Sequence, residues 1–560
     1  MIQIVGDELF KSRILIMLFS IIARAIGFII RLPFIIADLI YKGLILLLPD
    51  ESRFAVFRPV VHFLVGIILF GYILKYFMSI GTTYYALAII LAIVTTIITA
   101  TNNPTYIASA QGTQRWATYQ DIQKAKLLSK EPALVLGHKY KALVGPAQNN
   151  DWHTIIVGGA GTGKSTCSII PTLLSFKGSV IVLDIKGELE ATTRHFRREA
   201  IGPVYVLNPT KTDTYSYNPI EACDSTPDGI NECRELGNQL VPYPPGGARD
   251  NKWAYDGARG LVSAVAYIVA IEQGGTLRDV AYIITSLPHY QIAALIDSAD
   301  DTARMMAASF MIPNEKMRGY YISQASDYLQ SFALDYELVR VTTPVVNREF
   351  TFDMLESPCT VYLQIPEKKL QQASDLFRLI FMQLLRHLQA RGEGKQPHIL
   401  VCMDEFPQLG RIAELPDMLA TLRSRNIHIM LACQSLSQID TKYNSKDIRN
   451  DILSNCNYIS VFGASDKDGQ EYFSFLAGHQ TVKTQSGGRS DSAAKLAIGG
   501  TKGTNYNWQE SGQPLIRPEE LRDLGNNVLV INRDTFPMSL EKSYYFKPNF
   551  ILKNRLREGN

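Results

Sequence analysis

The residues with the clearest chemistry are Lys164 and Ser165, which close the pattern G-x-x-x-x-G-K-S that begins at Gly158. An apolar run, His153–Val157, precedes the pattern and a helix-compatible segment follows it, which is the context that a phosphate-binding loop requires. In such a loop the backbone N–H groups turn toward the phosphates, the lysine reaches the β- and γ-phosphates, and the serine hydroxyl ligates Mg²⁺. A glycine-rich turn that matches by accident would lack this context, so the sequence predicts a site for ATP and Mg²⁺. The residues expected to bind the nucleotide are Gly158, Gly159, Ala160, Gly161, Thr162, Gly163, Lys164, Ser165 and Thr166.

An acidic pair, Asp404 and Glu405, is the second candidate for catalysis, because it follows the mostly apolar run Pro397–Met403. We expect Asp404 to help Ser165 hold the Mg²⁺ through water, and Glu405 to act as the general base on the attacking water. An acidic pair after a buried strand can also be a plain helix cap. The phosphate-binding loop on the same chain favours the catalytic interpretation, in which Lys164 also takes part.

Two further kinds of side chain could act on the transferring phosphoryl group. Gln434 ends another apolar run and suits a sensor of the γ-phosphate, although an ordinary amide at the end of a strand is the alternative. Arg378, Arg423 and Arg425 are candidates for a group that stabilises developing charge, and such an arginine often comes from a neighbouring subunit. Each of the three can equally be a surface or structural arginine, and the sequence does not choose among them.

Buried strands alternate with helical stretches along the body of the chain, and these elements must position the candidate residues. Apolar runs occur at Ser179–Asp184, Val204–Leu207, Cys359–Ile365 and Ile427–Ser435, and a long amphipathic helix is expected at Ala373–Ala390. This order is typical of an α/β fold with a parallel sheet covered on both faces, whose ligands lie at the carboxyl ends of the strands.

Residues 221–341 interrupt this order, because they are rich in Ala, Leu, Ile and Tyr at helical spacing. We interpret them as an inserted all-helical subdomain, and we assign residues 102–220 and 342–560 to the nucleotide-binding domain. An ATPase with a subdomain between its catalytic motifs usually couples hydrolysis to conformational change.

The last part of the chain is expected to leave the sheet and return to it. Residues Thr481–Gln513 are rich in Gly, Ser, Thr, Gln and Asn, which predicts a mobile excursion rather than a core element. The sheet should resume at Asn527–Ile531.

The first hundred residues indicate a membrane anchor. No charged side chain occurs from Tyr76 to Gln114, and the preceding run Pro59–Leu74 is also apolar. Two segments of roughly 20 residues could span a bilayer as a hairpin at about 57–101. The segment 12–49 is apolar but carries charges that include Arg24, Arg31, Asp38 and Lys42, so it is either an interfacial amphipathic pair or a further hairpin. An anchor at residues 1–101 would leave the nucleotide site in the cytoplasm.

The charge and the cysteine content of the chain exclude few classes of function. The net charge of +3 resides in residues 1–101 and the rest of the chain is balanced, so any contact with nucleic acid would need a local arrangement of basic residues. The seven cysteines form no C-x-x-C pair and have no histidine at metal-ligand spacing. We therefore expect reduced, buried thiols, with neither a zinc site nor a disulfide framework.

Several motifs together resemble the coupling proteins of conjugation and type IV secretion systems, which are TraG-like and TraD-like P-loop ATPases. The similarity covers most of residues 112–470 in the order of that family. The matching segments are Gly112–Ala117, His153–Ile220, Trp253 with Ala258–Arg259, Val361–Pro366, Met403–Phe406 and Cys433–Gln438.

The resemblance implies a RecA-like P-loop NTPase core with an inserted all-α domain and an N-terminal transmembrane anchor in the bacterial inner membrane. It implies homohexamers around a central channel, contact with inner-membrane components of the secretion system, and DNA binding with little sequence preference. The cargo would be a DNA–relaxase complex or an effector protein. Family members usually have a clear loop between two spans, whereas the expected hairpin here turns almost at once. Many also carry a long acidic C-terminal tail, and this chain ends with Arg555–Asn560.

The leading interpretation is thus an inner-membrane ATPase that delivers a substrate to a type IV secretion channel. One alternative is an FtsK-like translocase of the chromosome, although no appended winged-helix module is evident. Others are a coupling ATPase that serves effector proteins only, and a membrane-tethered platform whose nucleotide regulates docking.

Overall fold

The computed structural model describes residues 112–244, 247, 249–272, 275–490 and 503–556. The chain divides into two compact units, Met1–Ser109 and Ala110–Asn560, and only the second is described here. The expected membrane hairpin at about 57–101 and the apolar segment 12–49 lie outside the described residues.

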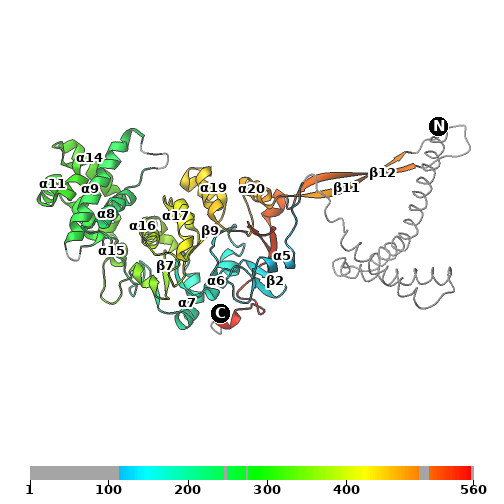
Figure 1. The fold of residues 1–560 in the computed structure, drawn as a ribbon. Coiled ribbons are helices and arrows are strands. Elements are labelled where there is room, and N and C mark those ends of the chain that lie inside the picture. The colour runs from blue at the N-terminus through cyan, green and yellow to red at the C-terminus, as the bar shows by residue number, and fades with distance from the viewer. Residues whose placement is uncertain (1–111, 245–246, 248, 273–274, 491–502, 557–560) are drawn as a thin grey trace, which may run out of the picture. The chain divides into compact units, whose positions relative to one another are not determined.

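A twelve-stranded sheet, drawn near the middle of Figure 1, forms the frame of the second unit, in the order β1-β3-β2-β14-β13-β10-β4-β9-β8-β5-β7-β6. The seven strands from β10 to β6 are parallel, and the remaining five join them antiparallel. The parallel strands are β4 (His153–Val157), β5 (Ser179–Asp184), β6 (Val204–Leu207), β7 (Thr360–Gln364), β8 (Ile399–Met403), β9 (Ile427–Cys433) and β10 (Tyr458–Val461). The antiparallel strands are β1 (Leu128–Ser129), β2 (Gly137–Lys139), β3 (Ala142–Val144), β13 (Asn527–Asn532) and β14 (Met538–Glu541).

The parallel strands are buried on both faces, as their continuous apolar runs predicted. Successive side chains of a strand point to opposite faces, so neighbouring residues belong to different cores. Ile155 and Ile181 lie in one core, whereas Ile156 and Val180 lie in the other. The first core also contains residues of α16 (Leu370–Gln389), and the second those of α6 (Ile170–Ser175). This arrangement confirms the predicted α/β fold with a covered sheet.

The chain between β6 and β7 forms helices in its described part, shown in green in Figure 1. One of its two 20-residue helices, α9 (Lys252–Ile271), is the one described helix that is long and apolar enough to cross a membrane. However, 67% of its most apolar window is buried within the protein, so α9 serves as a core helix. The other helices are α8 (Pro227–Leu240), α10 (Leu277–Ser286), α11 (His289–Ser298), α12 (Asp301–Met306), α13 (Ala308–Met311), α14 (Glu315–Leu334) and α15 (Tyr336–Thr342).

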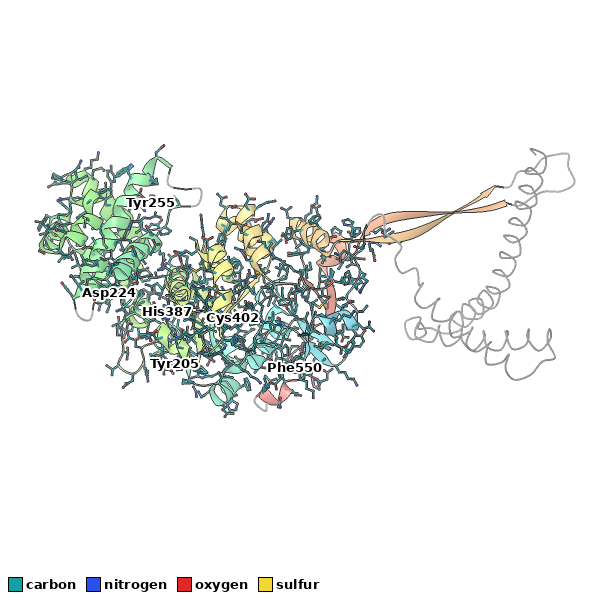
Figure 2. All side chains as sticks on the ribbon, viewed as in Figure 1. Tyr205, Asp224, Tyr255, His387, Cys402 and Phe550 are labelled. Carbon is teal, nitrogen blue, oxygen red and sulfur yellow. The ribbon has the colours of Figure 1, made fainter. Side chains whose placement is uncertain are left out.

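The remaining helices accompany the nucleotide-binding part of the chain. Figure 2 marks Cys402 of β8 within this part, His387 on α16, and Tyr255 on α9. The chain also contains α5 (Tyr119–Lys124), α7 (Glu188–Ala200), α17 (Leu415–Thr421), α18 (Leu436–Tyr443), α19 (Lys446–Asn455) and α20 (Lys467–Ala477).

The polar segment Thr481–Gln513 differs from its prediction. Its described residues pair as two long antiparallel strands, β11 (His479–Ser490) and β12 (Gly503–Pro514), in a separate two-stranded sheet. The segment leaves the central sheet, as expected of an excursion, but the strand pairing within it was not predicted. Backbone hydrogen bonds between two strands need no apolar side chains, which is why composition alone missed the ribbon.

Candidate functional site

The phosphate-binding loop follows β4 directly and leads into a tightly packed helical turn. Gly161 and Gly163 adopt positive φ angles of 74° and 100°, which glycine reaches without steric cost. The next residues, Ser165–Ile169, form a π-helical turn that continues into α6. The Lys164 ammonium group is buried and donates to the carbonyl oxygen of Gly158 at 2.5 Å. The lysine thus lies along the loop that it is expected to serve.

The sheet register brings the acidic pair to this loop. Val157 of β4 lies beside Cys433 of β9, so these two strands end level, and Met403 of β8 lies beside Leu431, so β8 ends two residues earlier on the same side. As a result, the Ser165 hydroxyl lies 3.3 Å from a carboxylate oxygen of Asp404. A hydroxyl and a carboxylate at this distance are the ligand types that Mg²⁺ prefers.

The electrostatics of the acidic pair are unusual. Burial raises the pKa of Asp404 to about 6, and the negative charge of Glu405 adds to this effect, while Lys164 opposes it. Glu405 itself has a left-handed backbone with a φ of 58°. Its buried Oε1 atom has no hydrogen-bond partner among the described residues, and its side chain does not cap the following helical turn. A buried carboxylate oxygen without a partner, on a residue with a left-handed backbone, is typical of a functional site rather than of a helix cap.

One cavity of about 480 Å³ contains most of the predicted residues. It also contains residues that the sequence analysis did not select, from the loop after β5, from the turn after β8 and from the start of α16 with the turn before it. The sequence carried a signal for those after β5, because they follow a buried strand whose carboxyl end lies beside the phosphate-binding loop. Predicted residues in the cavity wall are Gly159, Ala160, Gly161, Gly163, Lys164, Ser165, Thr166, Asp404, Glu405 and Gln434; unexpected ones are Ile185, Lys186, Glu188, Glu367, Leu370 and Gln408.

Gln434 lies where a γ-phosphate sensor would be expected. It follows the last residue of β9, which pairs with the last residue of β4, so it is level with Gly158. Its backbone N–H donates to the side-chain oxygen of Gln438 at 3.0 Å. Its side chain belongs to the cavity wall, between the loop and the acidic pair.

The three candidate arginines are not part of this cavity wall. Arg378 pairs with Asp375 at 2.8 Å and donates to the carbonyl of Leu409 at 3.3 Å. Arg423 and Arg425 lie just before the start of β9, whereas Gln434 follows its end. The seven residues of β9 span about 20 Å, so the two arginines lie at the amino end of the strand, far from Gln434. Within one chain, Arg423 and Arg425 therefore do not reach the phosphate-binding loop of that chain.

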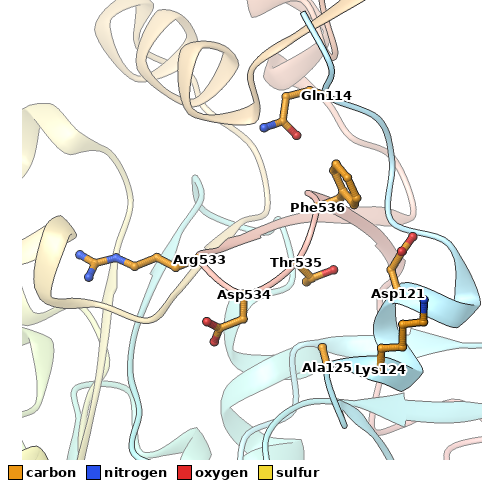
Figure 3. A pocket seen from close by; sticks show the side chains of 8 residues that line it. All are labelled: Gln114, Asp121, Lys124, Ala125, Arg533, Asp534, Thr535 and Phe536. Atoms are coloured by element: carbon orange, nitrogen blue, oxygen red, sulfur yellow. The ribbon is translucent and has the colours of Figure 1, made fainter. Parts of the chain in front are cut away.

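A second cavity of about 450 Å³ lies between α5 and the loop that joins β13 to β14. Figure 3 shows the Arg533 guanidinium directed away from Asp121 and Lys124. Asp121 is already paired with Arg115, at 2.6 Å, and the Arg115 guanidinium stacks on Phe536. The charged groups around this cavity do not converge on one point, so it is a weaker candidate for chemistry than the cavity beside Lys164.

The parallel sheet, the glycine-rich loop at the end of β4 and the acidic pair at the end of β8 define an α/β protein of the P-loop class. A family model described as "Type IV secretory system Conjugative DNA transfer" matches residues 115–558. The chain belongs to this family.

Individual relatives agree with this assignment. Protein VirD4 of Agrobacterium fabrum is 28% identical over 459 residues, which cover 79% of this chain and 66% of VirD4. The conjugal transfer protein TraG of Escherichia coli is 25% identical over 457 residues, which cover 73% of this chain and 70% of TraG. The alignment with VirD4 thus spans just under two thirds of that relative.

Solved structures share the fold. The unbound form of the bacterial conjugative coupling protein TrwBΔN70 superposes with a TM-score of 0.60 at 16% identity, covering 79% of this chain and 95% of TrwBΔN70. TrwB in complex with the non-hydrolysable ATP analogue ADPNP gives the same TM-score at 15% identity, covering 78% and 96%.

Proposed function

We propose that this protein is an ATPase that couples nucleotide hydrolysis to the delivery of a macromolecular substrate into a type IV secretion channel. The observation that carries the proposal is the 3.3 Å approach of Ser165 to Asp404 in the cavity that also holds Lys164 and Glu405. The family description supports DNA transfer as the purpose of the hydrolysis.

Each side chain of the cavity has a distinct role in this proposal. Ser165 and Asp404 hold Mg²⁺, and Lys164 and the backbone N–H groups of the loop bind the β- and γ-phosphates. Glu405 orients the attacking water and accepts its proton, for which a carboxylate oxygen without a partner is suited. Gln434 contacts the γ-phosphate from β9. The cation supplies Lewis-acid stabilisation of the charge that develops on the phosphate oxygens.

The cofactor assignment has support from the structural relatives. TrwB has been solved with ADPNP, with the GTP analogue GDPNP, and with ADP and Mg²⁺. The donor set here, a hydroxyl and a carboxylate beside a buried lysine, fits the same ligands.

We also propose the architecture in which this site works. Residues 1–101 anchor the protein in the bacterial inner membrane as a multi-pass segment. Residues 102–220 and 342–560 form the nucleotide-binding domain, and residues 221–341 form the helical domain that contacts partners. The protein assembles as a homohexamer, in which Arg378, Arg423 or Arg425 of one subunit could act on the site of the next. Arg423 and Arg425 are favoured over Arg378, because they lie at the far edge of their own sheet.

The substrate is DNA with its attached relaxase, taken up without sequence preference. The family description favours this cargo over effector proteins alone and over chromosome translocation of the FtsK type.

The ATPase rate of the full-length protein in detergent, with and without single- or double-stranded DNA across a salt series, tests this function. DNA contacts through phosphates weaken as salt increases, so a DNA-handling motor should show strong stimulation that fades with salt. Basal turnover without any stimulation would contradict the DNA cargo and leave a protein cargo. The Glu405→Gln variant is measured in parallel, and the ATPase activity that it loses relative to the wild type is the activity of this site.

A further inference from the structure

The chain segment that follows β14 packs against the end of the phosphate-binding loop. The backbone N–H of Tyr545 donates to the carbonyl oxygen of Thr166 at 3.2 Å. The Tyr544 ring lies beside Gly163, since a Cβ atom placed on that glycine would be 3.6 Å from Tyr544 Cε1. Two consecutive residues of this segment therefore contact the last turn of the loop.

This segment lies on the side toward which the ribose and base of a bound nucleotide must extend out of the cavity. Asp404 and Gln434, which belong with the γ-phosphate, follow β8 and β9 on one side of β4. On the other side of β4 the sheet continues with β10, β13 and β14. A triphosphate whose γ end points toward Asp404 has its α end, and hence its ribose and base, near Thr166. That end faces the side of the sheet from which Tyr544 emerges.

Tyr544 and Tyr545 of this segment pack against the core, and they leave the next ring, Phe546, exposed. The Phe546 side chain is 53% exposed, and its ring centroid lies 5.3 Å from that of Tyr544 and 5.5 Å from that of Tyr545. The Lys547 ammonium group lies 4.5 Å from the centroid of the Tyr544 ring. An exposed phenyl ring held by two neighbouring rings is preorganised for stacking, because little side-chain freedom is lost when a flat ligand binds.

We propose that Tyr544 and Phe546 form the subsite for the base of the bound nucleotide, with Phe546 as the ring on which a purine stacks. This inference rests on the proposed function, because it assumes that the loop at Gly158–Ser165 binds a nucleoside triphosphate. Stacking on an apolar ring is tolerant of the base, so the subsite accepts adenine and guanine alike and favours both over the smaller pyrimidines.

Binding measurements on the full-length protein in detergent with Mg²⁺ test the subsite, using ATP, GTP, CTP and inorganic tripolyphosphate as ligands. The Phe546→Ala variant should bind ATP and GTP roughly 5- to 150-fold more weakly than the wild type, as expected for the loss of one stacked base. Its affinity for tripolyphosphate, which has no base, should stay within about twofold. Because Phe546 is half-exposed, this variant is expected to fold.

Two further variants sharpen the test. Phe546→Trp should retain the affinity for ATP, and its added indole fluorescence should be quenched when a base stacks on it. Phe475→Ala, which removes a phenyl ring that is 72% exposed on α20, should bind all four ligands like the wild type.

The possible failures are distinguishable. An unchanged ATP affinity in Phe546→Ala would overturn the subsite, and so would an equal loss of tripolyphosphate affinity, since that would indicate a distorted loop. A wild-type protein that binds neither ATP nor tripolyphosphate would overturn the proposed function itself, and the subsite with it.

Discussion

The hydroxyl of Ser165 and the carboxylate of Asp404 lie 3.3 Å apart, although they are separated by 239 positions in the sequence. The contact exists because β4 and β8 flank β9 in the same parallel register and end at the same edge of the sheet. The helices inserted between β6 and β7 do not disturb it, since they leave and re-enter the sheet beyond β5. A cation site assembled in this way tolerates large insertions between its two ligands.

Replacing Lys164 with Thr should abolish ATP hydrolysis, with a loss of at least about 100-fold, because a preorganised positive charge at the phosphates is removed. Phosphate release by the purified protein and substrate transfer in cells measure the effect. Lys177→Thr is the matched control, since its side chain is 67% exposed and pairs with Glu131 on the surface. Transfer at the parental rate by the Lys164 variant would show that hydrolysis at this site does not drive it.

The Glu405→Gln variant should bind ATP within a few-fold of the wild-type affinity but hydrolyse it about 100- to 10,000-fold more slowly, because the general base is lost. Equilibrium binding and single-turnover hydrolysis separate the two effects. Glu188→Gln changes another carboxylate of the same cavity and should leave the single-turnover rate within about threefold. If both variants slowed hydrolysis equally, the general charge of the cavity would matter rather than the position of Glu405.

Binding of Mg²⁺ with nucleotide should weaken as the pH falls through about 6. The pKa of Asp404 is raised to about 6, so the carboxylate is neutral below that pH and loses its attraction for the cation. Magnesium titrations at pH 5.5, 6.5 and 7.5 measure this dependence. ATP itself also binds protons in this pH range. The Asp404→Asn variant is the control, because its pH dependence can come only from the titration of ATP. Identical pH profiles for the two proteins would contradict the assignment.

Arg386 of α16 should stabilise the junction between the inserted helices and the sheet. Its guanidinium pairs with Glu232 of α8 at 2.7 Å and with Glu414 at 3.3 Å, and only 16% of the side chain is exposed. The Arg386→Met variant should lose about 2 to 3 kcal/mol of unfolding free energy, because two carboxylates are left without their partner.

Denaturant unfolding measures the effect of that change. Lys467→Met breaks an exposed pair with Glu471 and should cost less than about 0.5 kcal/mol. Adding Glu232→Gln to Arg386→Met should cost less than the two single changes together. Strict additivity would show that the pair does not act as a unit.

Acid should destabilise the fold through a group of buried histidines at the starts of the central strands. Burial lowers the pKa of His428 to about 3 and also lowers those of His153 and His398. His428 stacks on Trp152 and lies 3.0 Å from the His398 ring nitrogen, so a positive charge there would be buried beside a second imidazole. Since the unfolded chain binds protons below its ordinary pKa of 6.5 and the folded chain does not, stability is retained above pH 6.5 and is lost as the pH falls through it.

The expected slope is about 1.4 kcal/mol per pH unit for each histidine that stays neutral in the folded state. Urea unfolding at pH 7.5, 6.0 and 5.0 gives this slope. It should be smaller in the His428→Gln variant than in the wild type. Equal slopes would show that His428 is not among the groups responsible.

The sequence predicted those features that depend on local pattern. Runs such as Ser179–Asp184 and Val204–Leu207 become strands with the same bounds, because residues buried on both faces must be continuously apolar. The short strand Tyr458–Val461 was missed, since four residues after a helical stretch, one of them the polar Ser460, carry too little periodic signal. The paired strands β11 and β12 were missed for a different reason, because their composition is that of a loop.

The residue types and spacing at Gly158–Ser165 and at Asp404–Glu405 were sufficient to identify a nucleotide site, since that chemistry is encoded in short segments. Only the tertiary structure decided which distant residues join those segments. Sheet order and register placed Lys186 and Leu370 in the cavity wall, put Arg423 at the opposite edge, and brought Tyr544 behind the loop. These relations depend on long-range backbone pairing between strands, which no local pattern of side chains specifies.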